Sequence, residues 1–292
     1  SGSTLVSVSP YYTFRIYNDV TLEARSAYYI TLYANPEIGG SPTATPNPAY
    51  VGQTVTLTPN PDSCYNFSGW SPSDVTITNN SFTMPAKAVT VTANYTVKKY
   101  PIAVNITKTG NSPNTPGTVT GSNTYDCGST ATLTAEPATG FTFTGWYESG
   151  SQVSTTTTYT FTVRGNHTLE ARFKAILYNI TLTASPAGAG SQSATPNKAY
   201  VGQTVTLTAT PNSCYDFSSW TAPPDVTITN NSFVMPAKDV TVTANYTIKT
   251  YTIAVNITKT GNSPNTPGTV TGSNTYDCGS TATLTAEPAT GF

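Results

Sequence analysis

Apolar and polar residues alternate strictly along many short stretches of this chain. In Val89–Tyr95 every second residue is apolar, which is the pattern of a strand with one buried face. The same alternation occurs at Ile30–Ala34, Ile102–Ile106, Ala131–Ala135, Leu169–Phe173 and Ile180–Ala184. Clusters of Gly, Pro and Asn separate these stretches, and no run of ten or more residues has helical spacing. The pattern therefore predicts an all-β chain of many short strands.

Long segments of the sequence occur twice. Residues 49–58 recur without a change as residues 199–208, and residues 102–141 recur as residues 253–292. The repeating unit is about 150 residues long, and a fixed period of this kind is typical of a repeat architecture.

Each long repeat divides into two related modules, which we call A and B. Both consist of an alternating strand, a turn, a Thr-rich second strand, an aromatic segment that ends in Trp, and a closing strand. We assign residues 28–98 and 177–249 to A modules and residues 99–176 to a B module. Residues 1–27 match the back half of a B module, and residues 250–292 match the front half. The prediction is a tandem array of modules of about 70–80 residues.

The two half modules are complementary in sequence. Only Thr142–Glu148 of the complete B module has no counterpart between Phe292 and Ser1. Two arrangements follow from this: either the front half of one copy completes the back half of the next by strand addition, or the chain is a window of a longer covalent array. The expected partners are therefore further copies of the chain or adjacent repeats, joined head-to-tail.

Composition excludes several classes of function. With 13 basic residues, 14 acidic residues and a net charge of −1, the chain lacks the basic patch that binds nucleic acid. Only 9% of the residues are charged, but 37% are hydrophobic, which is enough for packed cores and argues against disorder. No apolar run approaches the ~18–20 residues of a membrane span, and the first residues do not form a secretion signal. We therefore expect mature or excised sequence without membrane insertion.

Four sequence elements follow one another in a fixed order in the first A module. Val51–Thr58 (Val-Gly-Gln-Thr-Val-Thr-Leu-Thr) precedes the aromatic segment that ends in Gly-Trp at Trp70, and Phe82–Ala86 (Phe-Thr-Met-Pro-Ala) precedes Val89–Tyr95. This order resembles the divergent internalin-B-type repeats of bacterial and archaeal surface proteins. The resemblance implies β-grasp-like or β-sandwich-like modules that form a rod, as in an extracellular stalk or adhesin. The B modules depart from the pattern because they lack the Met-Pro-Ala element.

The four cysteines occupy repeated positions. Cys64 and Cys214 precede the aromatic segments of the A modules, and Cys127 and Cys278 precede Thr-Ala-Thr-Leu-Thr strands of B sequence. A metal site is not expected, because the chain has a single His and no Cys-x-x-Cys motif. We expect the disulfides Cys64–Cys127 and Cys214–Cys278; pairing of Cys127 with Cys214, or buried free thiols, are the alternatives. Disulfides imply an oxidising, extracellular location.

Nine Asn-x-Ser/Thr sequences are candidate glycosylation sites. They are centred on Asn66, Asn79, Asn94, Asn105, Asn166, Asn179, Asn230, Asn245 and Asn256. In a chain with 59 Thr, several of these sequences arise by chance. We expect Asn94, Asn105, Asn245 and Asn256 to face solvent on strands, where a glycan can be carried.

Each aromatic segment contributes one Trp and one Phe at corresponding positions. The pairs are Trp70 with Phe67, Trp146 with Phe143, and Trp220 with Phe217. We interpret these side chains as core anchors, because a small module needs a large apolar residue in its core. An exposed stacking platform for sugars is the alternative.

No catalytic centre is expected. Glutamates recur with the repeat, and the sequence contains neither a phosphate-binding loop nor a nucleophile elbow. The sequence therefore predicts a non-enzymatic structural segment of a fibre or adhesin stalk on the cell surface, without a cofactor. The alternative is a surface binding module that recognises a host glycan or protein.

Overall fold

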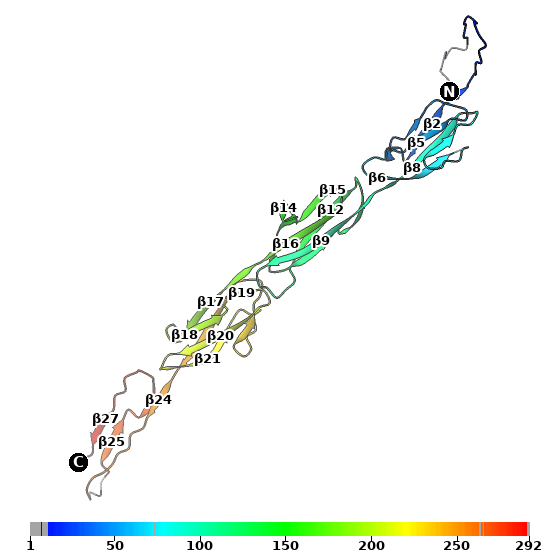
Figure 1. Cartoon of the computed structure of the whole chain (residues 1–292). Helices are drawn as coiled ribbons and strands as arrows, with labels where there is room; N and C mark the ends of the chain where they lie inside the picture. The colour runs from blue at the N-terminus through cyan, green and yellow to red at the C-terminus, as the bar shows by residue number, and fades with distance from the viewer. Residues whose placement is uncertain (1–6, 8–10, 73, 263, 265, 291–292) are drawn as a thin grey trace. The chain divides into compact units, whose positions relative to one another are not determined.

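A computed structural model describes Ser7, residues 11–72 and 74–262, Pro264 and residues 266–290 (Figure 1). These residues form β-strands and one 3-10 turn, η1 (Glu37–Gly39), without an α-helix. The prediction of an all-β chain of tandem modules is thus confirmed. Among the described residues, no helix has the length and hydropathy needed to cross a membrane.

The chain groups into two compact units. Unit 1 contains the residues up to Tyr100, together with the turns Tyr125–Ser129 and Thr162–Gly165, and unit 2 contains the remaining residues. The first A module therefore belongs to unit 1. Most of the B module, the second A module and residues 250–290 belong to unit 2.

The first A module consists of two three-stranded sheets and a short two-stranded pairing of its first strand with its fourth. Its strands are β1 (Ala27–Tyr28), β2 (Ile30–Asn35), β3 (Thr43–Thr45), β4 (Ala49–Tyr50), β5 (Thr54–Thr58), β6 (Tyr65–Pro72), β7 (Ser81–Thr83) and β8 (Val89–Val97). One sheet has the order β2-β8-β6 and the other β3-β5-β7. The first long strand β2 runs parallel to the last strand β8, with Ile30 opposite Val89. On its other side β8 pairs antiparallel with β6.

The core of this module lies between the two sheets. Ile30, Val89 and Val91 from one sheet meet Val55 and Phe82 from the other, and all five side chains are buried. Thr residues alternate with these side chains and cover the outer faces, because successive side chains of a strand point to opposite sides. The alternating pattern therefore produces a two-sheet layered module.

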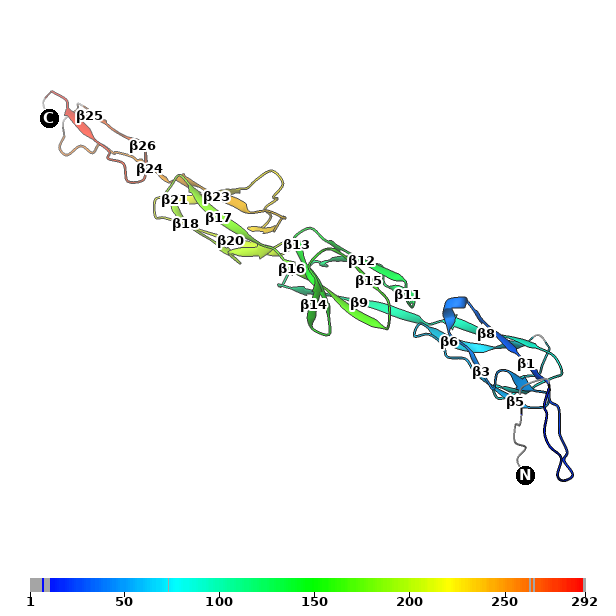
Figure 2. The same ribbon diagram turned by 90° about the horizontal axis from the view of Figure 1, so that it is seen from above.

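The second A module repeats this arrangement. Its strands are β17 (Leu177–Ser185), β18 (Gly190–Thr195), β19 (Lys198–Tyr200), β20 (Thr204–Pro211), β21 (Tyr215–Thr221), β22 (Ser232–Val234) and β23 (Val240–Ile248). Strand β17 pairs in parallel with β23, and β21 pairs antiparallel with β23 (Figure 2). The same residues recur in the core, with Met235 buried at the position of Met84.

The B module has the same topology with an added hairpin. Its strands are β9 (Lys99–Thr109), β10 (Gly117–Thr120), β11 (Asn123–Asp126), β12 (Thr130–Pro137), β13 (Phe141–Glu148), β14 (Ser151–Ser154), β15 (Thr158–Thr162) and β16 (His167–Ala175). Strand β9 pairs in parallel with β16, and β14 covers the free edge of β13. The fully buried Val163 takes the place of Met84, so the missing Met-Pro-Ala element is replaced by a smaller apolar side chain.

Residues 250–290 form only short strands. These are β24 (Thr250–Ile253), β25 (Gly268–Thr271), β26 (Asn274–Asp277) and β27 (Thr285–Pro288). Residues 254–260 have the same sequence as residues 103–109 of β9 but do not form a strand. The difference follows from strand pairing: β9 pairs with β16, and among the described residues no strand of this kind lies beside residues 254–260.

Candidate functional site

The candidate functional sites are the junctions between consecutive modules, which recur along the chain. A single residue separates the last strand of one module from the first strand of the next: Lys98 between β8 and β9, Ile176 between β16 and β17, and Lys249 between β23 and β24. These connections are far shorter than a flexible linker. Each junction is therefore held by the bonds and contacts that residues at the module ends make.

Disulfides close the A-to-B junctions. The structure pairs Cys64 with Cys127 and Cys214 with Cys278, with Cα–Cα distances of 5.2 and 5.3 Å. At the first of these junctions the Lys98 N–H donates to the Cys64 carbonyl, and the Cys127 N–H donates to the Lys98 carbonyl, both at 2.8 Å. Lys249 makes the same two bonds with Cys214 and Cys278. The backbone of Lys98 and that of Lys249 are thus hydrogen-bonded to both cysteines of their junctions.

The B-to-A junction uses the same positions without a covalent bond. The Ile176 N–H donates to the Gly140 carbonyl at 2.8 Å, as Lys98 does to Cys64. Gly140 directly precedes β13, as Cys64 precedes β6, and Val201 precedes the turn residue Gly202 as Cys127 precedes Gly128. A Gly–Val contact therefore occupies the place that a disulfide occupies in the A-to-B junctions.

Val201 contacts the backbone of the B module directly. Gly140 has a φ of 86°, and a Cβ atom there would lie 2.5 Å from Val201 Cγ2, so this position requires glycine. The carbonyl of Val201 accepts hydrogen bonds from Ser112 Oγ at 3.4 Å and from Asn114 Nδ2 at 3.3 Å. Both distances lie beyond the usual range for a strong hydrogen bond.

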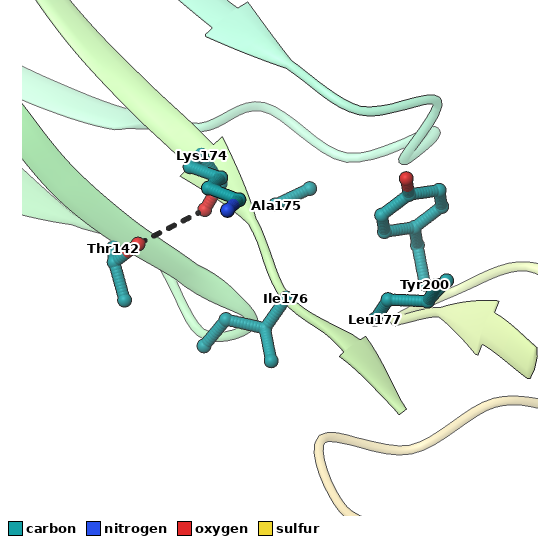
Figure 3. A pocket seen from close by; sticks show the side chains of 6 residues that line it. All are labelled: Thr142, Lys174, Ala175, Ile176, Leu177 and Tyr200. Atoms are coloured by element: carbon teal, nitrogen blue, oxygen red, sulfur yellow. Dashed lines mark hydrogen bonds between the residues drawn. The ribbon is translucent and has the colours of Figure 1, made fainter. Parts of the chain in front are cut away.

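A shallow pocket lies beside this contact. Figure 3 shows its lining residues, Thr142, Lys174, Ala175, Ile176, Leu177 and Tyr200. The only hydrogen bond drawn between them runs from Thr142 Oγ1 to the Lys174 carbonyl, at 3.4 Å. The lining contains no carboxylate, imidazole or thiol, so the pocket offers no acid–base or nucleophilic pair.

The three tryptophans differ in burial. Trp146 is fully buried, whereas Trp70 and Trp220 are half-buried. Phe67, Phe143 and Phe217 are also half-buried, and each ring centroid lies 5.0 to 5.5 Å from that of its Trp partner. The indoles of Trp70 and Trp220 donate to Asn80 and Asn231 Oδ1, at 2.8 and 2.9 Å. The indole N–H of Trp146 has no partner among the described residues.

Three of the nine candidate glycosylation sites have their amides engaged in the fold, and two of these, Asn94 and Asn245, are half-buried. Asn94 Nδ2 donates to Ser71 Oγ at 2.7 Å, and Asn245 Nδ2 donates to Thr221 Oγ1 at 2.7 Å. Both side chains bridge the bulge in the neighbouring strand and are half-buried. Asn94 and Asn245 thus lie on the outer side of their strands, as expected, but the bulge brings polar groups of the adjacent strand within reach of their amides; glycosylation at either position stays a prediction.

The other candidate glycosylation sites are exposed. Asn179 donates its backbone N–H and its amide to the Asp239 carboxylate, and these two bonds hold the pKa of Asp239 below its usual value. The remaining six are Asn66, Asn79, Asn105, Asn166, Asn230 and Asn256, and none has a side-chain hydrogen bond within the described part of the chain. Glycosylation at these six positions stays a prediction.

Two of the recurring glutamates, Glu23 and Glu170, form ion pairs with arginines. Glu170 accepts hydrogen bonds from Arg172 and from Thr107, and these bonds lower the pKa of its carboxyl group. Glu23 forms the corresponding pair with Arg25 at 2.6 Å. Across the described residues no group of three His, Cys, Asp or Glu side chains is placed to hold a metal ion. Both glutamates thus pair with the arginine two residues further along the chain, and Glu170 does so on strand β16.

The equivalence of the junctions was not recognised from sequence. Aligning the A and B modules on their aromatic segments places Gly140 over Cys64, and aligning their Thr-rich strands places Val201 over Cys127. The sequence therefore shows that Gly140 and Val201 correspond to the two cysteines. Only their contact in the structure shows that they take the place of a disulfide at the junction.

The comparison with protein-family models agrees with this repeat architecture. The family model described as the divergent InlB B-repeat domain matches residues 30–99, 107–177, 180–250 and 258–292, which confirms the resemblance noted above. A search of the curated proteins finds no match. Among solved structures, the Bacillus anthracis TIE protein aligns with a TM-score of 0.41 and 9% identity, over 77% of this chain and 51% of that chain. The present chain thus spans about half of that protein's length. Since the four family matches cover most of the sequence, the chain belongs to the divergent InlB B-repeat domain family.

Proposed function

We propose that the chain is a load-bearing, non-catalytic segment of an extracellular stalk or fibre on a cell surface. One observation carries this proposal: the first and last long strands of every complete module are adjacent and parallel. The chain therefore enters a module at one end of this strand pair and leaves it at the other end. Tension along the chain then slides the two strands past each other and loads all of their ladder hydrogen bonds together.

The disulfides fit the same role. Each A-to-B junction is crossed by two covalent connections, the backbone at the linker residue and the Cys–Cys bond. A second connection shares the load and limits extension when a module opens. Disulfides also persist in oxidising compartments outside the cytosol, which supports an extracellular location.

The aromatic segments favour a structural role over glycan recognition. A sugar-binding platform requires exposed rings on one side of a module. Instead, Trp146 is buried, and Trp70 and Trp220 are half-buried and bonded through their indole N–H groups. These three tryptophans therefore pack within their modules and do not form an exposed stacking platform.

Pulling one module in two directions tests the load-bearing role. In the full chain, handles attached through click-reactive residues at positions 27 and 98 pull β2 and β8 in shear. Handles at positions 37 and 98 lie at the same end of the strand pair and peel it apart bond by bond. We expect a severalfold higher unfolding force in the shear direction. Equal forces in the two directions would contradict the proposal.

We also propose that the half modules are completed by complementary halves, from further copies of the chain or from adjacent repeats. Leu22 and Leu284 are 50% and 48% exposed, whereas their counterparts in the complete B module, Leu169 and Leu133, are 1% and 0% exposed. Each half therefore exposes apolar side chains that a complete module buries, at a cost of roughly 1.5–3 kcal/mol per side chain.

Electrophoresis of native material distinguishes the two proposed sources of the complementary half module, which are separate copies of the chain and adjacent repeats. Assemblies that release 30.7 kDa chains under denaturing conditions indicate separate copies, and much larger chains that survive reduction indicate adjacent repeats. For separate copies, Leu22→Asp is expected to abolish assembly, and Ile38→Asp, at another exposed position, is the control. Native 30.7 kDa chains that stay monomeric would exclude both sources.

A further inference from the structure

Two exposed tyrosines lie on the outer face of the first A module. Tyr29 directly precedes β2 and Tyr33 lies within it, and these residues are 69% and 58% exposed. Ile30 and Leu32 of the same strand pack in the core. Because successive side chains of a strand alternate, Tyr29, Thr31 and Tyr33 point to the outer side. A strand rises about 3.3 Å per residue, so the two tyrosines lie ~13 Å apart along it.

The fold of the module makes no use of these two side chains. Within the described residues, neither ring stacks on another aromatic ring, and neither hydroxyl group has a hydrogen-bond partner. An exposed ring also forgoes the free energy that burial of its apolar surface would give. The stability of the first A module therefore does not explain why tyrosine occupies positions 29 and 33.

The second A module has an internally bonded side chain at the position of Tyr29. There, Asn179 donates its backbone N–H and its amide to the Asp239 carboxylate, at 2.8 and 3.2 Å. In the first A module, Ala88 stands at the position of Asp239. Both partners of this interaction are thus different in the first module, where an exposed ring and a methyl group take their places.

The position of Tyr33 differs between the two A modules in the same way. Its counterpart is Thr183, whose hydroxyl oxygen lies 2.8 Å from that of Thr243 on the neighbouring strand. The neighbouring strands of the two modules have identical sequences over Val89–Tyr95 and Val240–Tyr246. The tyrosines therefore change the exposed side of β2 and leave the strand with which it pairs unchanged.

The outer face of the sheet formed by β2, β8 and β6 has hydrogen-bonding groups but no charge (Figure 1). Asn35 Nδ2 donates to Asn94 Oδ1 at 3.1 Å, and Asn94 Nδ2 donates to Ser71 Oγ at 2.7 Å, so amide and hydroxyl groups extend across all three strands. None of these strands contains Asp, Glu, Lys or Arg. A ligand that matches this face therefore has apolar patches, many hydroxyl or amide groups, and no charge.

We propose that this surface binds a neutral, extended glycan. We call it the tyrosine face and define it by Tyr29, Thr31, Tyr33 and Asn35. The C–H groups on one side of a sugar ring stack on the electron-rich face of an aromatic ring, and sugar hydroxyls exchange hydrogen bonds with Thr and Asn side chains. Tyrosine also supplies rigid contact area at a low cost in conformational entropy.

The spacing of the tyrosines selects for a chain of sugars. A separation of ~13 Å exceeds the width of a single sugar ring, so the two tyrosines contact different sugars of one oligosaccharide or polysaccharide. The inference adds a binding site to one module of the array. It holds or fails independently of the load-bearing role proposed above.

Affinity electrophoresis of the full chain tests the site. Native gels contain hydroxyethylcellulose, laminarin, a mannan or a galactomannan as neutral polysaccharides, and alginate as the charged one. We expect at least one neutral polysaccharide to retard the chain and alginate not to. Tyr29→Asn/Tyr33→Thr installs the residues of the second A module, and we expect it to weaken the apparent affinity at least about tenfold.

Three controls make the test specific. Because the second A module folds with Asn and Thr at these positions, the double variant is expected to keep its fold, which hydrogen exchange of the β8 amides checks. Tyr251→Ala removes a tyrosine that is 57% exposed outside the tyrosine face and is expected to leave binding unchanged. Asn179→Tyr/Thr183→Tyr/Asp239→Ala builds a second such face and is expected to strengthen retardation.

Two results would overturn the proposal. One is the absence of retardation by every neutral polysaccharide, or equal retardation of the original chain and of the Tyr29→Asn/Tyr33→Thr variant. The other is concentration-dependent self-association, measured by sedimentation, that this variant abolishes while no polysaccharide binds. That result would assign the tyrosine face to a second copy of the chain.

Discussion

Replacing Trp146 with Ala is expected to destabilise the B module by about 3–5 kcal/mol. The side chain is fully buried, and its ring packs against Phe143 with a centroid distance of 5.5 Å. Removing the indole leaves a cavity between the two sheets that the surrounding strands cannot fill. Since the modules need not unfold together, the loss is best measured from the exchange of B-module amides in increasing denaturant.

Conservative replacements distinguish packing from hydrogen bonding. Trp146→Phe keeps most of the apolar volume and removes an indole N–H that has no partner among the described residues, so we expect a far smaller loss than for Ala. Trp220→Phe removes a hydrogen bond to Asn231, and we expect a loss of about 0.5–1.5 kcal/mol in the second A module. A Trp146→Ala loss below about 1 kcal/mol would show that this ring is not the anchor of the B core.

Breaking the Cys64–Cys127 disulfide is expected to cost about 4 kcal/mol in the free energy of unfolding of unit 1. The bond closes a loop with a sequence separation of 63 residues, and its removal returns the entropy of that loop to the unfolded chain. The Cys64→Ser/Cys127→Ser variant, compared with the oxidised chain in chemical denaturation, measures this difference.

The second disulfide provides an internal control. Cys214–Cys278 has a sequence separation of 64 residues, so Cys214→Ser/Cys278→Ser is expected to lose a similar amount, but from unit 2. The Cys214→Ser/Cys278→Ser variant should leave unit 1 unchanged, because the loop that this bond closes lies entirely in unit 2. Loss of stability in unit 1 from this variant would contradict the prediction.

The strands themselves could be predicted from sequence because the signal is local. Alternation in Val89–Tyr95 requires only neighbouring residues, and the structure forms β8 over that stretch. The repeat likewise identified corresponding positions, such as Cys64 and Cys214, without structural information. The alternation reflects a physical requirement, since one face of each strand must be buried.

What could not be predicted depends on contacts between distant residues. The parallel pairing of β2 with β8 joins residues about 60 positions apart, and alternation does not specify a strand's neighbour. The bulge beside Asn94 brings Ser71 within reach of its amide, which no periodicity indicates. The role of Gly140 likewise becomes apparent only when Val201 lies against it.

The alternation of A and B modules also bears on how the chain folds. Val89–Tyr95 and Val240–Tyr246 have identical sequences, so β2 can pair with either. Its own partner lies about 60 residues away and the competing one about 210, which favours the native pairing by about 1 kcal/mol of loop-closure free energy. The strand at the equivalent place in the intervening B module, β16, has a different sequence and does not substitute for β8. The order of modules therefore separates interchangeable strands and opposes strand exchange, a common route to misfolding in repeat proteins.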